Sequence, residues 1–265
     1  SPAANPASAY CQPGVEPLGR SGVSCPMITR TACQASSTAA LLNAARVVKK
    51  DLKRLRVVIT GVGAAGVATT KSLLALGIRD IVGCDRAGVI WRGRETHMTP
   101  AKRWYAGRTN PRNLRGSAED ALRGADVFIG LSGPGAIRPR ALARMATRAI
   151  VFALANPDPE VPPEIAARYA RVVATGRSDY PNQINNALAF PGVFKGALEV
   201  RARRITPAME VAAARAIAGI IRPEELSEET IVPSIFNPRV VPAVARAVAR
   251  AAVRGGVSRR ALPIT

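Results

Sequence analysis

The feature that most constrains the fold of this chain is a glycine-rich turn between an apolar run and a helical pattern. The turn, Gly61-Val62-Gly63-Ala64-Ala65-Gly66, fits the spacing GxGxxG. It follows the apolar run 55–60 and opens a helical pattern over 64–76, which Gly77 ends as a left-handed cap. The spacing alone is a weak signal. Its place between a strand and a helix predicts a turn that binds phosphate.

Each glycine of this turn has a predicted role. Gly61 permits the tight turn, Gly63 lets the backbone approach a pyrophosphate, and Gly66 lets the helix pack closely on the strand. The free N–H groups at the start of the helix, at Ala64 and Ala65, add a partial positive charge for the phosphates. The alternative is a glycine-rich turn that holds no ligand.

An acidic residue at the end of the next apolar run supports a dinucleotide. Asp85 ends the run 80–85 and lies after Gly66 at about the expected spacing of 20 residues. Its carboxylate is suited to accept hydrogen bonds from ribose hydroxyls and to repel a 2′-phosphate, which favours NAD over NADP. Arg86 follows immediately and weakens this preference, so NADP stays possible.

Strands and helices alternate along most of the chain. Further apolar runs at 126–130, 149–154 and 171–174 are separated by helical segments, one of them at 118–122 behind a capping pair of Ser117 and Asp120. Apolar strands of this kind predict a doubly wound, Rossmann-like α/β fold with a parallel sheet covered on both faces. The chain ends in helices expected over 207–221 and 238–254.

The N-terminal part has a different composition. Residues 1–35 are rich in Ser, Pro, Ala and Gly without a regular period, so we expect an irregular segment, disordered or non-homologous. A helix capped by Ser36 or Ser37 then begins a single dinucleotide-binding domain over 36–265. Cys84 is expected in the core, and His97, the only histidine, in a solvated loop.

The net charge of +20 raises the possibility of a nucleic-acid partner, but its distribution argues against one. Of 38 basic residues 32 are Arg, and they are scattered along the chain instead of forming a tail or stripe. We therefore expect no specific nucleic-acid partner. No apolar run approaches the roughly 20 residues of a membrane helix, and no signal-peptide pattern is present, so we expect a cytoplasmic protein without a membrane partner.

From Leu41 to Arg254 the chain resembles bacterial NAD-type malic enzymes. The motifs that carry this resemblance are the segments 41–44 (LLNA), 56–66 (RVVITGVGAAG), 80–88 (DIVGCDRAG), 124–135 (GADVFIGLSGPG), 152–157 (FALANP) and 174–186 (ATGRSDYPNQINN). The last two are the most specific to this family. The resemblance identifies the chain as the NAD-binding domain of an oxidoreductase of malate metabolism, which converts malate oxidatively to pyruvate and CO2.

The resemblance also implies roles for particular residues. Ser132 belongs to the loop under the nicotinamide, Asn156 contacts substrate and nicotinamide, and Asn185 with Asn186 hydrogen-bonds the dicarboxylic acid. From the residues alone, Asn156-Pro157 is typical of a turn and the two asparagines of a helix cap.

The family also implies groups that this sequence does not match. Its catalytic base and acid are a Lys and a Tyr of an N-terminal domain, and its Mn²⁺ or Mg²⁺ ligands include an Asp-Asp motif near position 30. Here residues 28–33 read Ile-Thr-Arg-Thr-Ala-Cys, and Glu16 is the only acid before position 51. We therefore expect no catalytic residue and no metal ligand within this chain.

Two interpretations remain open at this point. In the first, the chain is a truncated malic enzyme domain that needs a missing N-terminal domain or forms a homo-oligomer. In the second, it is a stand-alone nucleotide-binding module that pairs with a partner and has no malic enzyme activity of its own. A neighbouring reading frame that encodes the absent domain would distinguish them.

Overall fold

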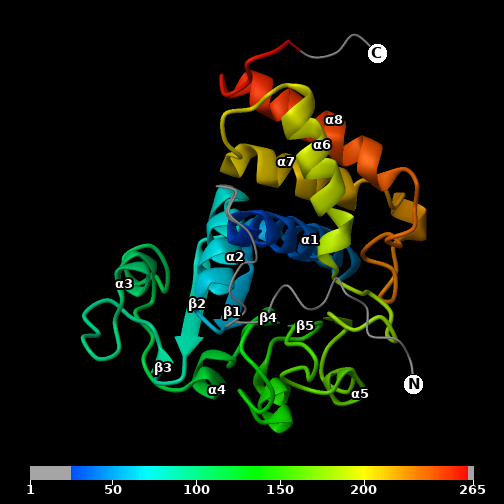
Figure 1. The fold of residues 1–265 in the computed structure, drawn as a ribbon. Coiled ribbons are helices and arrows are strands. Elements are labelled where there is room, and N and C mark those ends of the chain that lie inside the picture. Colours follow the sequence, from blue (N-terminus) through cyan, green and yellow to red (C-terminus); the bar gives the residue numbers. More distant parts are fainter. Residues whose placement is uncertain (1–24, 262–265) are drawn as a thin grey trace.

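The computed structural model describes residues 25–261 (Figure 1). The β-strands are β1 (Arg56–Thr60), β2 (Asp80–Asp85), β3 (Gly88–Val89), β4 (Val127–Gly130), β5 (Ile150–Ala153) and β6 (Val172–Thr175). The α-helices are α1 (Cys25–Val47), α2 (Ala64–Ala75), α3 (Pro100–Ala106), α4 (Ala118–Ala121), α5 (Pro163–Ala166), α6 (Phe190–Glu199), α7 (Pro207–Ala218) and α8 (Val240–Arg254). Short 3-10 helices are η2 (Leu52–Arg54), η3 (Pro139–Arg144), η4 (Asn186–Leu188) and η5 (Pro223–Glu225).

The strands form one six-stranded sheet in the order β3-β2-β1-β4-β5-β6. All neighbours from β2 to β6 pair in parallel, which confirms the predicted doubly wound α/β class. The winding direction reverses beside β1, because β2 lies on one side of it and β4 on the other. Ligands of such sheets bind in the crevice at the carboxyl ends of the strands on either side of this reversal.

One strand was not predicted. The short β3 pairs with β2 in antiparallel register, Cys84 opposite Val89 and Asp85 opposite Gly88. Gly88 adopts φ +97°, and a Cβ added there would lie 2.4 Å from the carbonyl oxygen of Gly116. Only glycine fits this reversal. The edge of the sheet therefore folds back directly after Asp85 and places the following loop beside the crevice.

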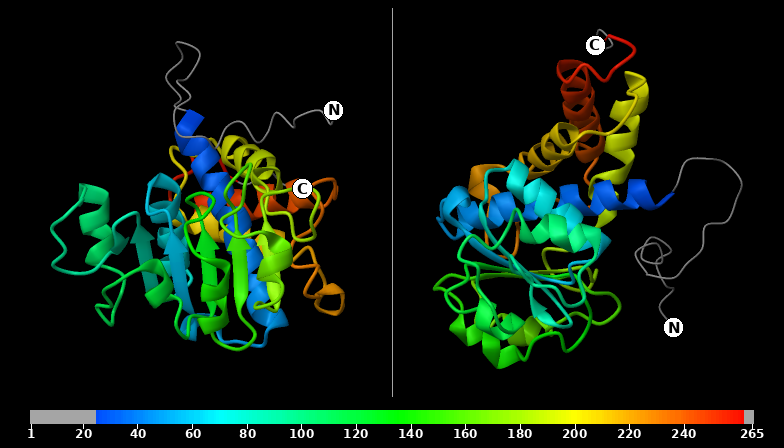
Figure 2. Two further views of the ribbon diagram at one scale, coloured as in Figure 1. Left: turned by 90° about the horizontal axis from the view of Figure 1, so that it is seen from below. Right: turned by 90° about the vertical axis from the view of Figure 1, so that its left-hand side faces the viewer.

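Alternate strand residues enter two separate hydrophobic clusters. Val57 and Ile59 of β1 join the cluster that contains α1, α2 and the C-terminal helices. Val58 and Phe128 point to the opposite face and pack with Leu122 and the segments around α4 and α5. The right-hand view of Figure 2 shows these helices on the two sides of the sheet. Burial on both faces explains why the strands read as continuous apolar runs.

The first helix begins earlier than the sequence predicts. α1 starts at Cys25, so residues 25–35 are helical and the expectation of an irregular segment is wrong for them. Ser36 and Ser37 lie in the middle of this helix and are buried in the protein, so they are not its caps. The Ser36 hydroxyl donates to the carbonyl of Asn185 (2.9 Å). Residues 1–24, the rest of that expected segment, lie outside the described residues.

The predicted helix signals are otherwise confirmed. Gly77 has φ +93° directly after α2, and Ser117 with Asp120 forms the capping box of α4. Cys84 is buried, as expected for a core thiol. The two C-terminal helices occur as α7 and α8, each slightly shorter than expected. Among residues 25–261, none of the helices has the length and apolar character required to span a membrane.

α6, α7 and α8 form a compact group that packs on α1, above the sheet in Figure 1. Asn43 of α1 joins this group to the rest of the domain. Its buried side-chain amide donates to the carbonyls of Ala218 (3.0 Å) and Ile231 (3.0 Å). Because both acceptors are buried backbone groups, this single side chain satisfies two polar atoms that water cannot reach.

Candidate dinucleotide site

A large open cavity lies at the carboxyl edge of the sheet, where the winding reverses. Its volume is about 1910 Å³. The cavity contains the glycine turn after β1, the residues after β2, and the loop after β4. The predicted cofactor residues in the lining are Gly61, Gly63, Ala64, Ala65, Asp85, Arg86 and Ser132, and Cys84, His97 and Ser117 line it as well. Among the predicted cofactor residues, Gly66 and Asn156 are not part of this lining.

The three glycines of the turn have different surroundings. Gly61 has φ +87°, and an added Cβ would meet the Leu131 carbonyl oxygen at 2.3 Å. A Cβ on Gly66 would lie 2.4 Å from the carbonyl oxygen of Gly61. Both glycines are therefore required by packing within the protein. A Cβ on Gly63 would meet nothing within 4 Å, so this position faces the open cavity.

The start of α2 offers hydrogen-bond donors to this cavity. Gly63 is the N-cap of the helix and provides no side-chain hydrogen bond to it. The first N–H groups of an α-helix have no acceptor within the helix. In α2 these groups include those of Ala64 and Ala65, and both residues line the cavity. An anion at this point would satisfy these groups and the positive end of the helix dipole.

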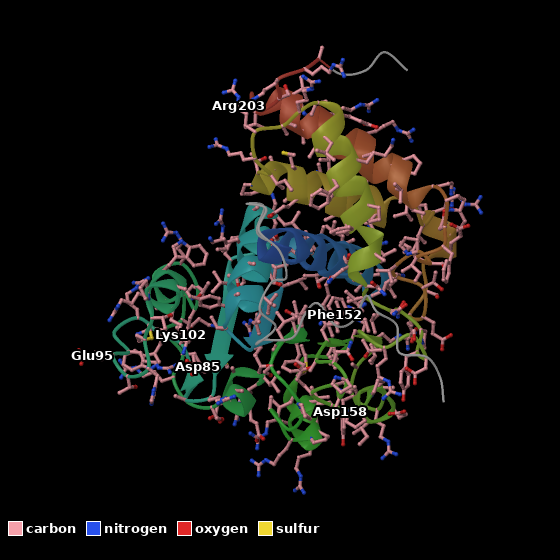
Figure 3. The ribbon with its side chains drawn as sticks, viewed as in Figure 1. Asp85, Glu95, Lys102, Phe152, Asp158 and Arg203 are labelled. Atoms are coloured by element: carbon pink, nitrogen blue, oxygen red, sulfur yellow. The ribbon has the colours of Figure 1, made fainter. Side chains whose placement is uncertain are left out.

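Asp85 is held by two basic side chains that the sequence analysis did not identify. Both of its carboxylate oxygens accept hydrogen bonds from Nη2 of Arg94, each at 2.9 Å, and Lys102 Nζ lies 2.6 Å from Oδ2. Figure 3 labels Asp85 and Lys102 in this region. Burial alone would raise the pKa of the Asp85 carboxyl. Hydrogen bonds from Lys102 and Arg94 outweigh burial, so this pKa lies below its usual value.

The lining of the cavity contains a second ion pair. Arg138 donates from Nε (2.8 Å) and from Nη2 (2.7 Å) to the carboxylate of Glu119. Hydrogen bonding to Arg138 lowers the pKa of Glu119 to about 2. Arg86 and Lys102 also line the cavity, so its basic side chains outnumber its carboxylates. This surplus of positive charge suits a ligand that carries phosphates.

The loops after β4 and β5 meet at a buried carboxylate. Glu160 is 2% exposed, and it accepts hydrogen bonds from the N–H groups of Ser132 (2.8 Å) and Ala155 (3.1 Å). Ser132 also donates from its hydroxyl to the hydroxyl of Thr60 (3.2 Å). Sequence reasoning missed Glu160, because a glutamate in a Pro-rich segment, 157–163, gives no local signal of burial.

The predicted substrate asparagines lie beyond the carboxyl ends of two neighbouring strands. Asn156 is exposed and follows β5, and the peptide bond to Pro157 is cis. Asn185 follows Ile184, whose N–H donates to the carbonyl of Thr175 at the end of β6 (2.8 Å). Asn185 and Asn186 do not line the cavity described above.

Several of the polar side chains in this region interact with residues close to them in the sequence. Asn185 caps η4 by accepting from the N–H of Ala187 (2.9 Å), which confirms the helix-cap alternative for this residue. Arg177 and Asp179 form an ion pair with each other (2.5 Å). His97 is exposed in a loop, as predicted, although it lines the cavity.

Metal-ligating side chains do not gather anywhere in residues 25–261. Across this range, no three His, Cys, Asp or Glu residues are grouped in a way that could hold a metal ion. The side chains of this range therefore do not fit a divalent cation.

Comparison with known proteins agrees with this fold. A family model described as "Malic enzyme, NAD binding domain" matches residues 28–253. The NAD-dependent malic enzyme of Geobacillus stearothermophilus is 55% identical over 222 residues, which are 84% of this chain and 46% of that protein. A probable NADP-dependent malic enzyme of Rickettsia prowazekii is 45% identical over 241 residues, 84% of this chain and 31% of that protein.

Solved structures give the same result. A crystal structure of malic enzyme from Pyrococcus horikoshii superposes with a TM-score of 0.84 at 44% identity, and the match covers 89% of this chain and 56% of that one. The chain thus spans about half or less of the length of the curated relatives reported above.

Proposed function

The chain belongs to the malic enzyme family as its NAD-binding domain, and from this premise we propose that the cavity at the carboxyl edge of the sheet holds a nicotinamide dinucleotide. In this proposal the pyrophosphate lies at the start of α2, against Gly63, Ala64 and Ala65. The adenosine ribose lies beside Asp85 and Arg86, and the nicotinamide lies toward the loop of Ser132.

The observation that carries this proposal is the open space at Gly63. Gly61 and Gly66 are fixed by contacts within the protein, but nothing in the described structure occupies the position of a Gly63 side chain. This space lies directly at the start of a helix that has no side-chain cap. A ligand phosphate accounts for both features, because it would fill the space and accept the free N–H groups.

The reaction proposed for the protein that contains this domain is the oxidative decarboxylation of malate to pyruvate and CO2. The bound dinucleotide would accept the hydride from C2 of malate. The side-chain amides of Asn156, Asn185 and Asn186 are proposed to orient the dicarboxylate, because an amide donates to a carboxylate without becoming charged. Asn156 is also proposed to contact the nicotinamide. The chain itself is proposed to supply no acid or base.

The choice between NAD and NADP depends on the charges around Asp85. A lone carboxylate would repel a 2′-phosphate, but this one is paired with Arg94 and Lys102, and Arg86 is exposed nearby. The three basic groups exceed the single acid. We propose that NAD is the main ligand, because Asp85 is placed to accept hydrogen bonds from the ribose hydroxyls, and that Lys102, released from Asp85, allows weaker binding of NADP.

Isothermal titration of the purified chain tests the proposed site. We expect NAD and ADP-ribose to bind, and the variant Gly63→Val to weaken both about tenfold or more, because its side chain fills the phosphate space. The matched control is Gly107→Ala, whose added Cβ makes only ordinary contacts at 3.6 Å and lies outside the cavity. Equal affinities in wild type and Gly63→Val would refute the placement of the pyrophosphate.

A second assay addresses the reaction. NADH formation is followed with malate and Mn²⁺ present, first for the chain alone and then after addition of a separately prepared N-terminal malic enzyme domain. We expect no turnover by the chain alone. Turnover without the added domain would show that residues of this chain supply the acid and base, contrary to the proposal.

A further inference from the structure

Glu160 is an unusual residue for the place it occupies. It is 2% exposed, and no ion pair in the described part of the chain involves it. A buried carboxylate is costly unless hydrogen bonds compensate for the lost water. An aliphatic side chain of similar size would fill the same space without this cost. The carboxylate therefore needs an explanation beyond packing.

The hydrogen bonds of Glu160 join two loops that are far apart in the sequence. Oε1 accepts from the N–H of Ser132 in the loop after β4, and Oε2 accepts from the N–H of Ala155 in the loop after β5. One oxygen therefore holds each loop. Burial raises the pKa of this carboxyl, although hydrogen bonds from the backbone at Ser132 and Ala155 oppose the shift.

The end of β4 is shaped to receive this carboxylate. A Cβ added to Gly130 would lie 2.3 Å from Cδ of Glu160, so any other residue at Gly130 would displace it. Gly130 is itself the last residue of β4. The position of Glu160 is thus fixed by the strand end on one side and by its two hydrogen bonds on the other.

Both loops belong to the end of the site where the nicotinamide is proposed to lie. Ser132 lines the cavity, and Ala155 immediately precedes Asn156. We propose that Glu160 is a positioning residue for the nicotinamide ring: it fixes the spacing of the Ser132 loop and the Asn156 turn, between which the ring is held. The adenosine half of the site, at Gly63 and Asp85, does not depend on it. This inference rests on the proposed function.

The variant Glu160→Gln tests the inference by a contrast between two ligands. Glutamine keeps the shape, but its amide nitrogen cannot accept, so one of the two N–H groups loses its partner. ADP-ribose lacks the nicotinamide. We expect its Kd to stay within about twofold of wild type, while the Kd for NAD rises about tenfold. The ratio of the two dissociation constants is the readout, because a general loss of structure would weaken both ligands alike.

Glu164→Gln is the matched control. Glu164 is an exposed acid on α5, four positions further along, and it hydrogen-bonds Tyr180 outside the cavity. This variant is expected to bind both ligands as wild type does. Equal loss of NAD and ADP-ribose in Glu160→Gln, or no change in either, would overturn the inference. If the wild-type chain binds neither ligand, the proposed function fails first and the inference fails with it.

A measurement on the wild-type chain covers the case in which Glu160→Gln does not fold. Amide resonances of Ser132 and Ala155 are followed by NMR during titration with NAD and with ADP-ribose. We expect NAD to shift both resonances clearly and ADP-ribose to leave them nearly unchanged. Equal shifts with the two ligands, or none with NAD, would contradict the proposed position of the ring between these loops.

Discussion

Glycines that are equivalent in a sequence motif have different functions in the folded protein. Gly61 and Gly66 touch backbone oxygens of the protein itself, whereas Gly63 faces open space. Replacement of Gly66 must therefore disturb the packing of α2 on β1, and replacement of Gly63 must disturb only what enters the cavity. Stability and ligand affinity separate these two roles.

We expect Gly66→Ala to lower the free energy of unfolding by about 1–3 kcal/mol, because its Cβ would lie 2.4 Å from the carbonyl oxygen of Gly61. Gly63→Ala should leave this free energy within about 0.5 kcal/mol of wild type. Urea unfolding followed by circular dichroism measures both. A variant Gly66→Ala as stable as wild type would show that α2 can move away from β1 at little cost.

Lys102 is a basic residue of the cavity whose contribution to ligand choice can be tested. Its Nζ pairs with Asp85 and lines the cavity, so it is placed to meet a 2′-phosphate. We expect Lys102→Met to weaken NADP about tenfold and NAD at most about twofold, because only NADP carries the additional charge. Titrations with both dinucleotides measure the ratio.

The control for Lys102 is Lys195→Met. Lys195 pairs with Glu199 on α6, away from the cavity, and carries the same charge. Its replacement lowers the net charge equally, so a similar loss of NADP affinity in both variants would assign the effect to overall charge. An unchanged ratio of NADP to NAD affinity in Lys102→Met would show that Lys102 does not contact the 2′-phosphate.

The sequence predicts every strand except β3, and it predicts the glycine turn, because the signals of these elements are local. The run 80–85 coincides with β2, and the capping pair of Ser117 and Asp120 marks the start of α4. The start of α1 could not be predicted in this way. The first residues of α1 lack a regular apolar period. Ser36 and Ser37, which the sequence predicts as caps, are instead buried against other parts of the chain.

Contacts between residues far apart in the sequence explain why parts of the site could not be predicted. Asp85 is recognisable from its spacing, but its contact with Lys102 depends on the fold-back at β3 and on the position of α3. Glu160 is recognisable only when β4 and β5 lie side by side, since its two donors come from different loops. A short window of sequence therefore gives no signal of the contact between Asp85 and Lys102 or of the hydrogen bonds of Glu160.

The close contact between α6 and α8 depends on a glycine. A Cβ on Gly196 would lie 2.2 Å from the carbonyl oxygen of Ala245, so the two helices approach each other through a glycine. We expect Gly196→Ala to lower the free energy of unfolding by about 1–3 kcal/mol, because the helices must separate. Gly107→Ala, which has room for its Cβ and φ −76°, should change it by less than about 1 kcal/mol.

Thermal unfolding of these two variants distinguishes helix packing from a general effect of removing glycine. Equal melting temperatures would show that α8 shifts without cost. A loss confined to Gly196→Ala would establish that the C-terminal helices are held at close range. NAD affinity should stay unchanged in both variants, since neither position lines the cavity.

For the whole molecule, two buried protonated groups link stability to pH. Burial raises the pKa of the Cys84 thiol from 9.0 to about 12, and burial also raises the pKa of Tyr105 above its usual value. Tyr105 contacts the position of Gly83, next to Cys84, and its hydroxyl accepts a hydrogen bond from the hydroxyl of Thr70 (3.0 Å). The two groups belong to different hydrophobic clusters on the two faces of one sheet.

Because both clusters share the strands of this sheet, we expect them to unfold together and to expose both groups at once. The unfolded chain then releases the Cys84 proton near pH 9, whereas the folded protein holds it up to about pH 12. The contribution of the protonated Cys84 thiol to the free energy of unfolding is therefore complete below pH 9 and declines as pH rises above 9. Above pH 9 the Cys84 thiol favours the unfolded chain about tenfold per pH unit, and the Tyr105 phenol adds a similar effect above its ordinary pKa of 10.0.

Urea unfolding at pH 8, 9, 10 and 10.5 measures this dependence, with salt held constant because of the high net charge. We expect Cys84→Ala and Tyr105→Phe each to flatten the decline in stability, since neither replacement can release a proton. The double variant should flatten it further. An equally steep decline in the double variant would mean that the alkaline loss comes from other groups and that the thiol and phenol are not the protons that unfolding releases.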